Sequence, residues 1–268
     1  MDYIHAIILA VVQGIAEFLP ISSSGHLVIS DALLQQTMGS SLPATMTDSA
    51  TMGIALHFGT LLSILVVYRR ELMDVIKDTQ TLAMIVVATI PVGVIGLLLK
   101  DYVEQAFHSP LTAGCALLAT AVFLLVGRRL QSQTPTADKV SLGTAIAVGL
   151  FQAVAIVPGI SRSGSTIAAG MACGMKREDA ARFSFLIAIP AIGGASVLEL
   201  KDFVTGEASF SGNLMPVVMG MLVSFVVGVL ALRWLIRMVV ADRLHLFAFY
   251  CLIVGIATII WQLSLSAS

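Results

Sequence analysis

Long apolar stretches, separated by short polar segments, dominate the chain. A membrane-spanning helix needs about 20 mostly apolar residues, because roughly 30 Å of hydrocarbon is crossed at about 1.5 Å per residue. Six stretches meet this length within a few residues. They are residues 51–68, 81–99, 111–127, 183–198, 215–236 and 245–263. The pattern predicts an all-α integral membrane protein with six transmembrane helices in contact with membrane lipid.

Two further apolar stretches, residues 4–34 and 142–175, are each broken midway by a cluster of Pro, Gly and Ser. The breaks cover residues 19–26 and 158–164. Each stretch is too long for one span and short for two. Irregular backbone at membrane depth is tolerated only where protein or a water-filled cavity surrounds it. We therefore expect two re-entrant helical hairpins, each entering and leaving on one side, with their breaks inside the protein.

Basic residues indicate how these elements are oriented, because cytoplasmic loops are enriched in Lys and Arg. Four polar segments carry three basic residues each, whereas the other loops carry only Lys100 and Lys201. All four segments can be cytoplasmic only if hairpin 4–34 enters from outside and hairpin 142–175 from the cytoplasm. Both termini are then outside. The twelve residues are Arg69, Arg70, Lys77, Arg128, Arg129, Lys139, Lys176, Arg177, Arg182, Arg233, Arg237 and Arg243.

The two hairpins resemble each other at an offset of 139 residues. Each is followed by three spans, and a unit with an odd number of crossings must repeat upside down, as an inverted-topology repeat. We expect the first repeat at residues 1–139 and the second at 140–268, within a single membrane domain. The matching residues are Gln13 with Gln152, Ile21 and Ser22 with Ile160 and Ser161, and Ser24 and Gly25 with Ser163 and Gly164.

Composition agrees with a membrane protein and excludes other classes. The chain is 57% hydrophobic and only 12% charged, with a mean hydropathy of +0.96, whereas soluble chains are about 25% charged. A net charge of −1 provides no basic surface for nucleic acid. The cysteines Cys115, Cys173 and Cys251 all lie in apolar stretches. Their spacing fits neither a disulfide framework nor a zinc site.

Glu17 and Arg162 are the only charged residues that this topology puts well inside the membrane. Each costs about 2.5–3.5 kcal/mol to insert near the centre of a spanning helix. A structural ion pair between the two repeats is one explanation. A functional site is the stronger one, because each charge lies beside a break that carries further polar groups.

The first break supplies a carboxylate, hydroxyls and an imidazole. Gln13 and Glu17 are one helical turn apart and share a face, where the carboxylate and the amide can hold a hard metal cation. The Glu17 carboxylate can alternatively accept a proton. Ser23 precedes His26 by three residues across a turn, so hydroxyl and imidazole can approach to about 3 Å. Ser22 is less favoured as the attacking group, because neighbouring side chains in a turn point in different directions. It is a candidate substrate-binding residue instead.

The second break supplies an anion site. The planar guanidinium of Arg162 suits bidentate bonds to phosphate oxygens. Gly159 and Gly164 let the backbone approach a ligand closely, and a helix expected from near Ser165 directs its positive dipole end at an anion. Close helix packing would explain the small residues but not the arginine. Further hydroxyl donors are Ser161, Ser163, Ser165 and Thr166.

Together the breaks hold an anion site, a cation-binding carboxylate, a hydroxyl and an imidazole. Phosphoryl transfer uses such groups, because an arginine and a metal ion neutralise the charge that develops on the phosphate oxygens. A site within the bilayer requires a substrate with a lipid tail.

Two sequence motifs resemble those of a known family. Residues Gln13–His26 resemble the first motif region of the undecaprenyl pyrophosphate phosphatases, the bacitracin-resistance family of bacterial inner membranes. Residues Pro158–Thr166 resemble the family's second motif, Pro-Gly-x-Ser-Arg-Ser-x-x-Thr, at every fixed position. The similarity includes Phe183–Pro190 and extends over essentially the whole chain. The family's first motif begins with Glu or Gln, so Gln13 fits it.

The resemblance implies that the protein removes one phosphate from undecaprenyl diphosphate, which recycles the cell-wall lipid carrier and confers bacitracin resistance. It also implies a divalent cation, Mg²⁺ or Ca²⁺, and a site that opens to the periplasm. Carried onto this chain, the principal catalytic residues are Glu17, His26 and Arg162. The resemblance assigns supporting or binding roles to Gln13, Ser23, Ser161, Ser163 and Thr166.

The sequence leaves three questions open: the function, the attacking group and the oligomeric state. Transporters also use inverted repeats with broken helices, so a polyprenyl-phosphate transporter or flippase is the other function, although the Ser23–His26 pair favours an enzyme. The attacking group is Ser23, His26 or a water molecule for which Glu17 or His26 acts as base, and the spacing prefers Ser23. The chain can act as a monomer or as a homodimer.

Overall fold

The computed structural model describes residues 3–38, 50–99, 102, 105–131, 140–204 and 214–267. Helices form most of this part of the chain, which confirms the predicted all-α class. Most of the predicted loop at residues 31–50, together with Lys100 and Lys139, lies outside the described residues. The helices are α1 (Tyr3–Ala16), α2 (Ser23–Met38), α3 (Ala50–Val67), α4 (Arg69–Lys77), α5 (Thr79–Leu98), α7 (Pro110–Leu130), α8 (Leu142–Val154), α9 (Arg162–Ala172), α10 (Arg177–Val204), α11 (Leu214–Val240) and α12 (His245–Ala267).

Five helices within the described residues are long and apolar enough to cross a membrane, namely α5, α7, α10, α11 and α12. They correspond to five of the six predicted spans. α3 corresponds to the sixth, at residues 51–68, but meets the same criteria only together with α4, from which it is bent by 76°. Two shorter apolar helices, α1 and α8, occupy the first halves of the predicted hairpins. The chain is therefore a multi-pass helical membrane protein.

The segment after α3 differs from the prediction, because it forms the short helix α4 instead of a loop. Val75 is buried on one face of this helix, and Arg69 and Arg70 lie at its start. Glu71 in the first turn and Lys77 in the last suit the helix dipole. The loop prediction was wrong because a search for long apolar stretches does not detect a short amphipathic helix.

Polar side chains start several of the long helices. Ser109, Ser141 and Ser161 each accept a hydrogen bond from the backbone N–H three residues later, at the starts of α7, α8 and α9. Asp78 does the same for α5. These side chains satisfy N–H groups that have no partner within the helix. The polar residues between apolar stretches therefore set where the helices begin.

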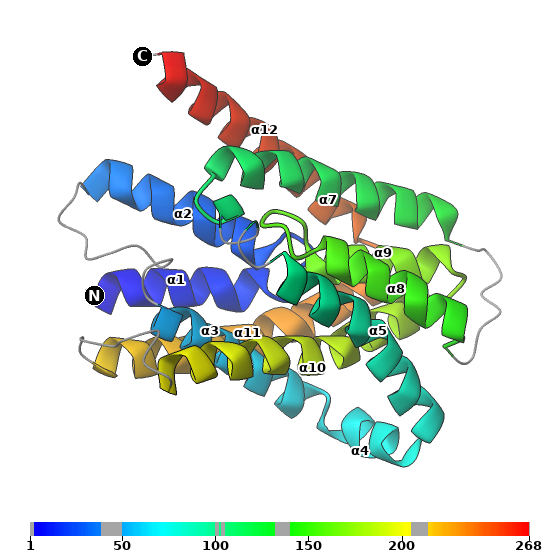
Figure 1. Ribbon diagram of the computed structural model, residues 1–268. Coiled ribbons are helices and arrows are strands. Elements are labelled where there is room, and N and C mark those ends of the chain that lie inside the picture. Colours follow the sequence, from blue (N-terminus) through cyan, green and yellow to red (C-terminus); the bar gives the residue numbers. More distant parts are fainter. Residues whose placement is uncertain are drawn as a thin grey trace.

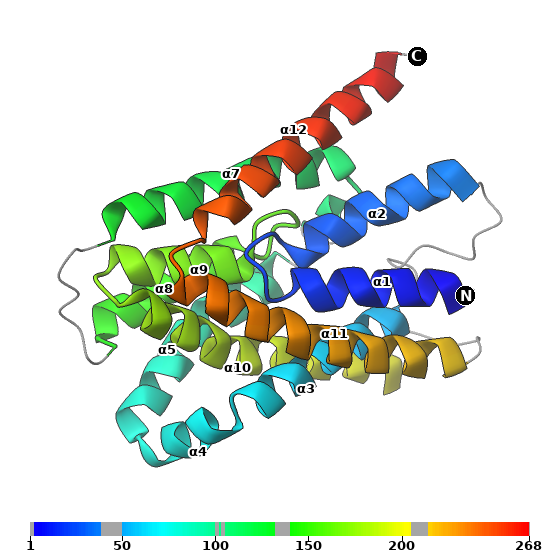
Figure 2. The same cartoon turned by 180° about the vertical axis from the view of Figure 1, so that it is seen from behind.

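The helix pairs α1–α2 and α8–α9 lie at opposite ends of the bundle (Figure 1). α1 and α2 lie at the end that holds both chain termini, and α8 and α9 lie at the other end. α1 packs against α11, and α8 packs in the corresponding way against α5. The breaks at residues 17–22 and 155–161 consequently approach each other near the middle of the bundle (Figure 2).

A cluster of aromatic rings packs against the first break. Phe18, in the break, and Phe185, on α10, are completely buried with ring centroids 6.0 Å apart. Tyr68, at the bend between α3 and α4, is also buried and lies 5.8 Å from Phe185. These rings form part of the buried core beside the break.

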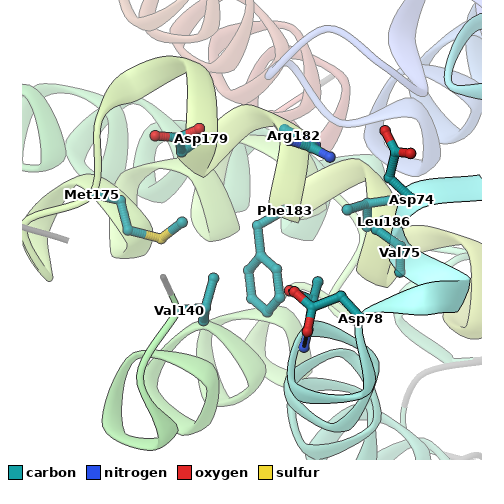
Figure 3. A pocket seen from close by; sticks show the side chains of 10 residues that line it. Asp74, Val75, Asp78, Val140, Met175, Asp179, Arg182, Phe183 and Leu186 are labelled. Carbon is teal, nitrogen blue, oxygen red and sulfur yellow. Dashed lines mark hydrogen bonds between the residues drawn. The ribbon is translucent and has the colours of Figure 1, made fainter. Parts of the chain in front are cut away.

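Basic segments meet at the end of the bundle away from the termini. Asp242, between α11 and α12, pairs with Arg128 of α7 at 3.4 Å and with Arg177 of α10 at 3.0 Å. A cavity of about 280 Å³ between α4, α5 and α10 lies at this end (Figure 3). It contains none of the predicted site residues. Its lining consists of Asp74, Val75, Asp78, Thr81, Val140, Met175, Asp179, Arg182, Phe183 and Leu186.

Candidate active site

The first break turns the chain back after α1. Pro20 has no backbone N–H and cannot continue a helix. Ser22 has φ = 69°, in the left-handed region, and its Oγ accepts a hydrogen bond from the Gly25 N–H at 3.3 Å. α2 then starts at Ser23, so its positive dipole end lies at the middle of the protein.

Glu17 lies at the centre of a cluster of polar side chains and is buried. Its Oε1 accepts a hydrogen bond from Arg162 Nη2 at 3.0 Å. Its Oε2 accepts from Ser23 Oγ at 2.6 Å and from Gln13 Nε2 at 3.2 Å. Four of the predicted site residues therefore meet at one carboxylate, and they come from both halves of the chain.

Arg162 is the first residue of α9, which starts here rather than near Ser165 as predicted. The helix starts earlier because Ser161 Oγ accepts the Gly164 N–H at 3.1 Å and so provides the N-cap. Arg162 Nη1 also donates to the Ser184 carbonyl oxygen at 3.3 Å. Both ends of the guanidinium are thus held, one by Glu17 and one by α10.

Thr166 supports Arg162 from the next turn of α9. Its hydroxyl lies 2.8 Å from the Arg162 carbonyl oxygen, which it can donate to, and 2.6 Å from Ser184 Oγ. Thr166 and Ser184 are both buried. In this structure Thr166 contacts the Arg162 backbone and α10, which fits the supporting role, and direct contact with substrate stays a prediction.

The serines of the two breaks tie the breaks to each other. Ser22 Oγ accepts the Gly159 N–H at 3.1 Å, and Ser163 Oγ donates to the Leu19 carbonyl oxygen at 3.2 Å. Ser161 Oγ lies 3.2 Å from Ser163 Oγ. The hydroxyls of these serines serve contacts within the protein, because buried backbone groups at the breaks need partners. The ligand-binding role of Ser22, Ser161 and Ser163 stays a prediction.

Gly159 and Gly164 serve close packing in this structure, and the approach to a ligand that the sequence suggested stays a prediction. Gly159 has φ = 100°, and a Cβ there would clash with the Ala113 carbonyl oxygen of α7. A Cβ on Gly164 would lie 3.2 Å from Pro20 Cβ, across the interface between the breaks. These glycines let the irregular segments approach each other and α7.

His26 is held by partners other than Ser23. Its Nδ1 lies 2.8 Å from the Ser22 carbonyl oxygen, and its Nε2 lies 2.8 Å from the Tyr250 hydroxyl. The expected hydroxyl–imidazole contact with Ser23 is replaced by the Ser23–Glu17 hydrogen bond. The prediction failed because spacing along α2 puts the two side chains near each other without deciding which neighbour each one faces.

Sequence reasoning missed two residues that contact the site. Tyr250 reaches His26 from α12, and a tyrosine in an apolar helix carries no signal of a partner so far away in sequence. Ser184 accepts from Arg162 through its carbonyl oxygen. It lies within Phe183–Pro190, where a serine among large apolar residues is the sequence signal that could have identified it.

The donor groups around Glu17 fit a hard cation that also binds a substrate. Gln13 is completely buried, and its Oε1 has no hydrogen-bond partner. Mg²⁺ and Ca²⁺ bind carboxylate and amide oxygens, and Mg²⁺ commonly takes only one or two carboxylates together with substrate phosphates. Within the described residues, no three His, Cys, Asp or Glu side chains gather as a metal site. A cation here would take its remaining oxygen ligands from the substrate or from water.

The chain is similar to known proteins over nearly its entire length. The sequence profile of the family described as bacitracin resistance protein BacA matches residues 6–257. An undecaprenyl-diphosphatase of Rhodopirellula baltica is 46% identical over 263 residues, which cover 98% of this chain and 99% of that protein. Proteins of the same name from Desulforapulum autotrophicum and Bacteroides thetaiotaomicron are 39% and 38% identical, over 97% and 98% of this chain and 98% and 100% of their own lengths. The match covers both breaks and all the helices that position Glu17 and Arg162, so the chain belongs to the bacitracin resistance protein BacA family.

Proposed function

We propose that this protein is an undecaprenyl-diphosphate phosphatase, which hydrolyses undecaprenyl diphosphate to undecaprenyl phosphate and inorganic phosphate. Its relatives carry the name of this activity. The observation that carries the proposal is the buried contact of Glu17 with both Arg162 and Ser23, at the point where two helices begin. This activity returns the cell-wall lipid carrier to use and accounts for bacitracin resistance.

The diphosphate binds between the starts of α2 and α9. Both helices direct their positive dipole ends to this point, which favours an anion. Arg162 offers a planar fork for two phosphate oxygens. Its bond to Glu17 shows that the guanidinium is already oriented into the cluster.

Ser23 is the attacking group that the geometry favours. Its hydroxyl donates to Glu17 at 2.6 Å, so the carboxylate is in position to accept the proton during attack. Ser23 Oγ then forms a bond to the terminal phosphorus, the anhydride bond breaks, and undecaprenyl phosphate leaves. Water then hydrolyses the phosphoserine, with His26 Nε2 as the base that takes a proton from the water, and Glu17 returns its proton to the Ser23 oxygen. His26 and water remain as alternative attacking groups, but the Ser23–Glu17 hydrogen bond favours Ser23.

Glu17 and Gln13 would hold the divalent cation, Mg²⁺ or Ca²⁺. The unpartnered Gln13 Oε1 and the neighbouring carboxylate supply hard oxygen ligands. When bound, the cation neutralises negative charge on the phosphate oxygens. All these groups come from one chain, so the proposed reaction does not require a homodimer.

We further propose the inverted-repeat topology, with six spans, two re-entrant hairpins and both termini outside the cytoplasmic membrane. The opposite placement of α1–α2 and α8–α9 supports it (Figure 1). Support also comes from Asp242, which joins two basic segments at one end of the bundle. Basic segments face the cytoplasm, so the opposite end of the bundle, where α1 and α2 lie, faces the periplasm. We propose that the site opens toward that end.

Phosphate release by purified protein in detergent tests the activity. A detergent micelle has no second compartment, so a transporter or flippase would release no phosphate from undecaprenyl diphosphate. We expect release that requires Mg²⁺ or Ca²⁺ and is lost in Arg162→Ala. Arg233→Ala, which removes an exposed arginine of α11, is the matched control and should retain activity. Absence of phosphate release by the wild-type protein would contradict the proposal.

Cysteine labelling tests the topology independently. Tyr102 and Ile76 are 73% and 71% exposed, and they lie on opposite predicted sides. In a background without Cys115 and Cys173, Tyr102→Cys should react with an impermeant thiol reagent in intact spheroplasts. Ile76→Cys, in α4, should react only after the membrane is broken. Labelling of Ile76→Cys from outside would overturn the proposed orientation.

A further inference from the structure

Tyr250 is the group outside the two hairpins that contacts a predicted catalytic side chain through a hydrogen bond and through its ring. Its hydroxyl lies 2.8 Å from His26 Nε2. The two rings are nearly parallel, with an interplanar angle of 11° and centroids 5.5 Å apart. Tyr250 belongs to α12, which otherwise packs mainly against α7. A residue 224 positions away thus determines where the His26 ring lies.

The hydrogen bonds of His26 fix which ring nitrogen carries the proton. The Ser22 carbonyl oxygen can only accept, so Nδ1, at 2.8 Å from it, must be the protonated nitrogen. In the neutral ring Nε2 is then an acceptor, and the Tyr250 hydroxyl donates to it. This leaves Nε2 as the only ring nitrogen that can take up a proton.

The contact between α12 and the first hairpin extends beyond this pair. Cys251 Sγ, on the next residue, donates to the Pro20 carbonyl oxygen at 3.7 Å. Further along, Trp261 Nε1 donates to Gln36 Oε1 at 3.1 Å. α12 therefore contacts α2 near the start of α2, at His26, and near its end, at Gln36 (Figure 2). The start of α12 therefore holds the turn in which the proposed site is formed.

We propose that Tyr250 is a positioning residue for His26, fixing the Nδ1–H tautomer and the direction of Nε2 in the active site. The proposal rests on the proposed phosphatase function for its kinetic consequence, but its structural part does not. When Nε2 takes up a proton it becomes a donor to the phenol oxygen, and the phenol O–H turns to another acceptor. The phenol keeps its own proton throughout.

Tyr250→Phe isolates the hydroxyl, because it keeps the stacked ring. We expect kcat for undecaprenyl diphosphate to fall about tenfold, a part of the roughly 10²- to 10⁴-fold that a positioned acid or base contributes. KM should change less than about twofold, because Tyr250 contacts the imidazole rather than Arg162 or Glu17. Tyr102→Phe, which removes a hydroxyl from an exposed tyrosine, is the matched control and should match the wild type.

¹⁵N NMR of histidine-labelled protein reads the tautomer without any turnover. The chain has five histidines, and His26→Gln identifies the His26 signals by their loss. In the wild type, His26 should show a protonated Nδ1 and an unprotonated, hydrogen-bonded Nε2, and in Tyr250→Phe the Nε2 shift should move. A wild-type spectrum with Nε2 protonated in the neutral ring, or an unchanged spectrum and kcat in Tyr250→Phe, would overturn the inference. Wild-type protein with the expected spectrum but no phosphate release would refute the proposed function instead.

Discussion

The two broken hairpins share a local structure but differ in what they contribute. In the first, Ser22 Oγ accepts the Gly25 N–H at 3.3 Å and lies 3.2 Å from Ser24 Oγ. In the second, Ser161 Oγ accepts the Gly164 N–H at 3.1 Å and lies 3.2 Å from Ser163 Oγ. The Ser-x-Ser-Gly element therefore makes the same side-chain hydrogen bonds in both copies, although φ is 69° at Ser22 and −73° at Ser161. Each serine caps a helix that starts at the middle of the protein.

Packing separates the two copies. Every residue of α9 from Ser163 to Met171 is buried, and the helix packs against α7, α8 and α10. In α2, over residues 23–36, only Gly25, Val28 and Ile29 are buried, and the helix packs mainly against α1 and α7. α9 is therefore enclosed by protein, whereas α2 is only partly buried.

Chemistry separates them as well. At the offset of 139 residues, Glu17 corresponds to Ile156, and Arg162 corresponds to Ser23. Gln13 donates to Glu17, whereas its counterpart Gln152 donates to the Ala88 carbonyl oxygen of α5. The first hairpin thus provides the Glu17 carboxylate and the Ser23 hydroxyl, and the second provides the Arg162 guanidinium. A single site results because both copies converge on the Glu17 carboxylate.

The largest expected effect is on turnover and comes from a substitution in the first hairpin. Ser23→Ala should lower turnover at least about a hundredfold, or roughly 2.7 kcal/mol, because it removes the attacking group. Its effect should not add to that of Glu17→Gln, since hydroxyl and carboxylate act as a unit. Ser30→Ala, two turns further along α2, is the control and should retain activity. Phosphate-release kinetics measure all three, and nearly full turnover in Ser23→Ala would leave His26 or water as the attacking group.

The contact between the hairpins should be almost as sensitive. A Cβ on Gly25 would lie 2.7 Å from Gly159 Cα, where backbone must move to admit it. We expect Gly25→Ala to lower the free energy of unfolding by about 1–3 kcal/mol, as overpacking does elsewhere. Unfolding in detergent measures this. Gly53→Ala adds its methyl group to open space and should have a small effect, so equal losses in both variants would contradict a tight contact between the breaks.

The sequence predicted the spans, the breaks and the two central charges, because each follows from the membrane itself. Apolar length defines α5, α7, α10, α11 and α12, and a charge such as Glu17 is too costly at this depth to be incidental. The partners of His26 could not be predicted in this way. Tyr250 faces it only because the start of α12 lies beside the start of α2, a contact set by packing of elements far apart in the chain.

The contacts that the break serines make within the protein were not predictable for a related reason. A hydroxyl near an expected anion suggests binding, and only the packed structure shows that Ser22 and Ser163 satisfy backbone groups of the opposite break. Burial of those backbone groups creates the need, and no local pattern reveals which N–H or carbonyl oxygen will be buried.

A smaller effect separates the shape of the Arg162 side chain from its charge. Arg162→Lys should lower turnover about tenfold or more, because an ammonium cannot form two parallel bonds to phosphate oxygens. The protein should remain folded, as its melting in detergent will report. Arg233→Lys on α11 should have no effect on turnover. If Arg162→Lys retains wild-type turnover, the guanidinium contributes only charge to the second hairpin's share of the site.

The smallest effect tests whether the shared caps are equivalent. Ser161→Ala removes the N-cap of α9 and should lower the free energy of unfolding by about 1 kcal/mol. Ser22→Ala removes the same cap from α2, but it also leaves the Gly159 N–H without its acceptor at 3.1 Å. Because an unsatisfied buried N–H adds its own cost, Ser22→Ala should be the more damaging of the two. Equal losses, measured by unfolding of both variants in the same detergent, would mean that this bond does little to hold the hairpins together. The packing of Gly25 against Gly159 would then account for their contact.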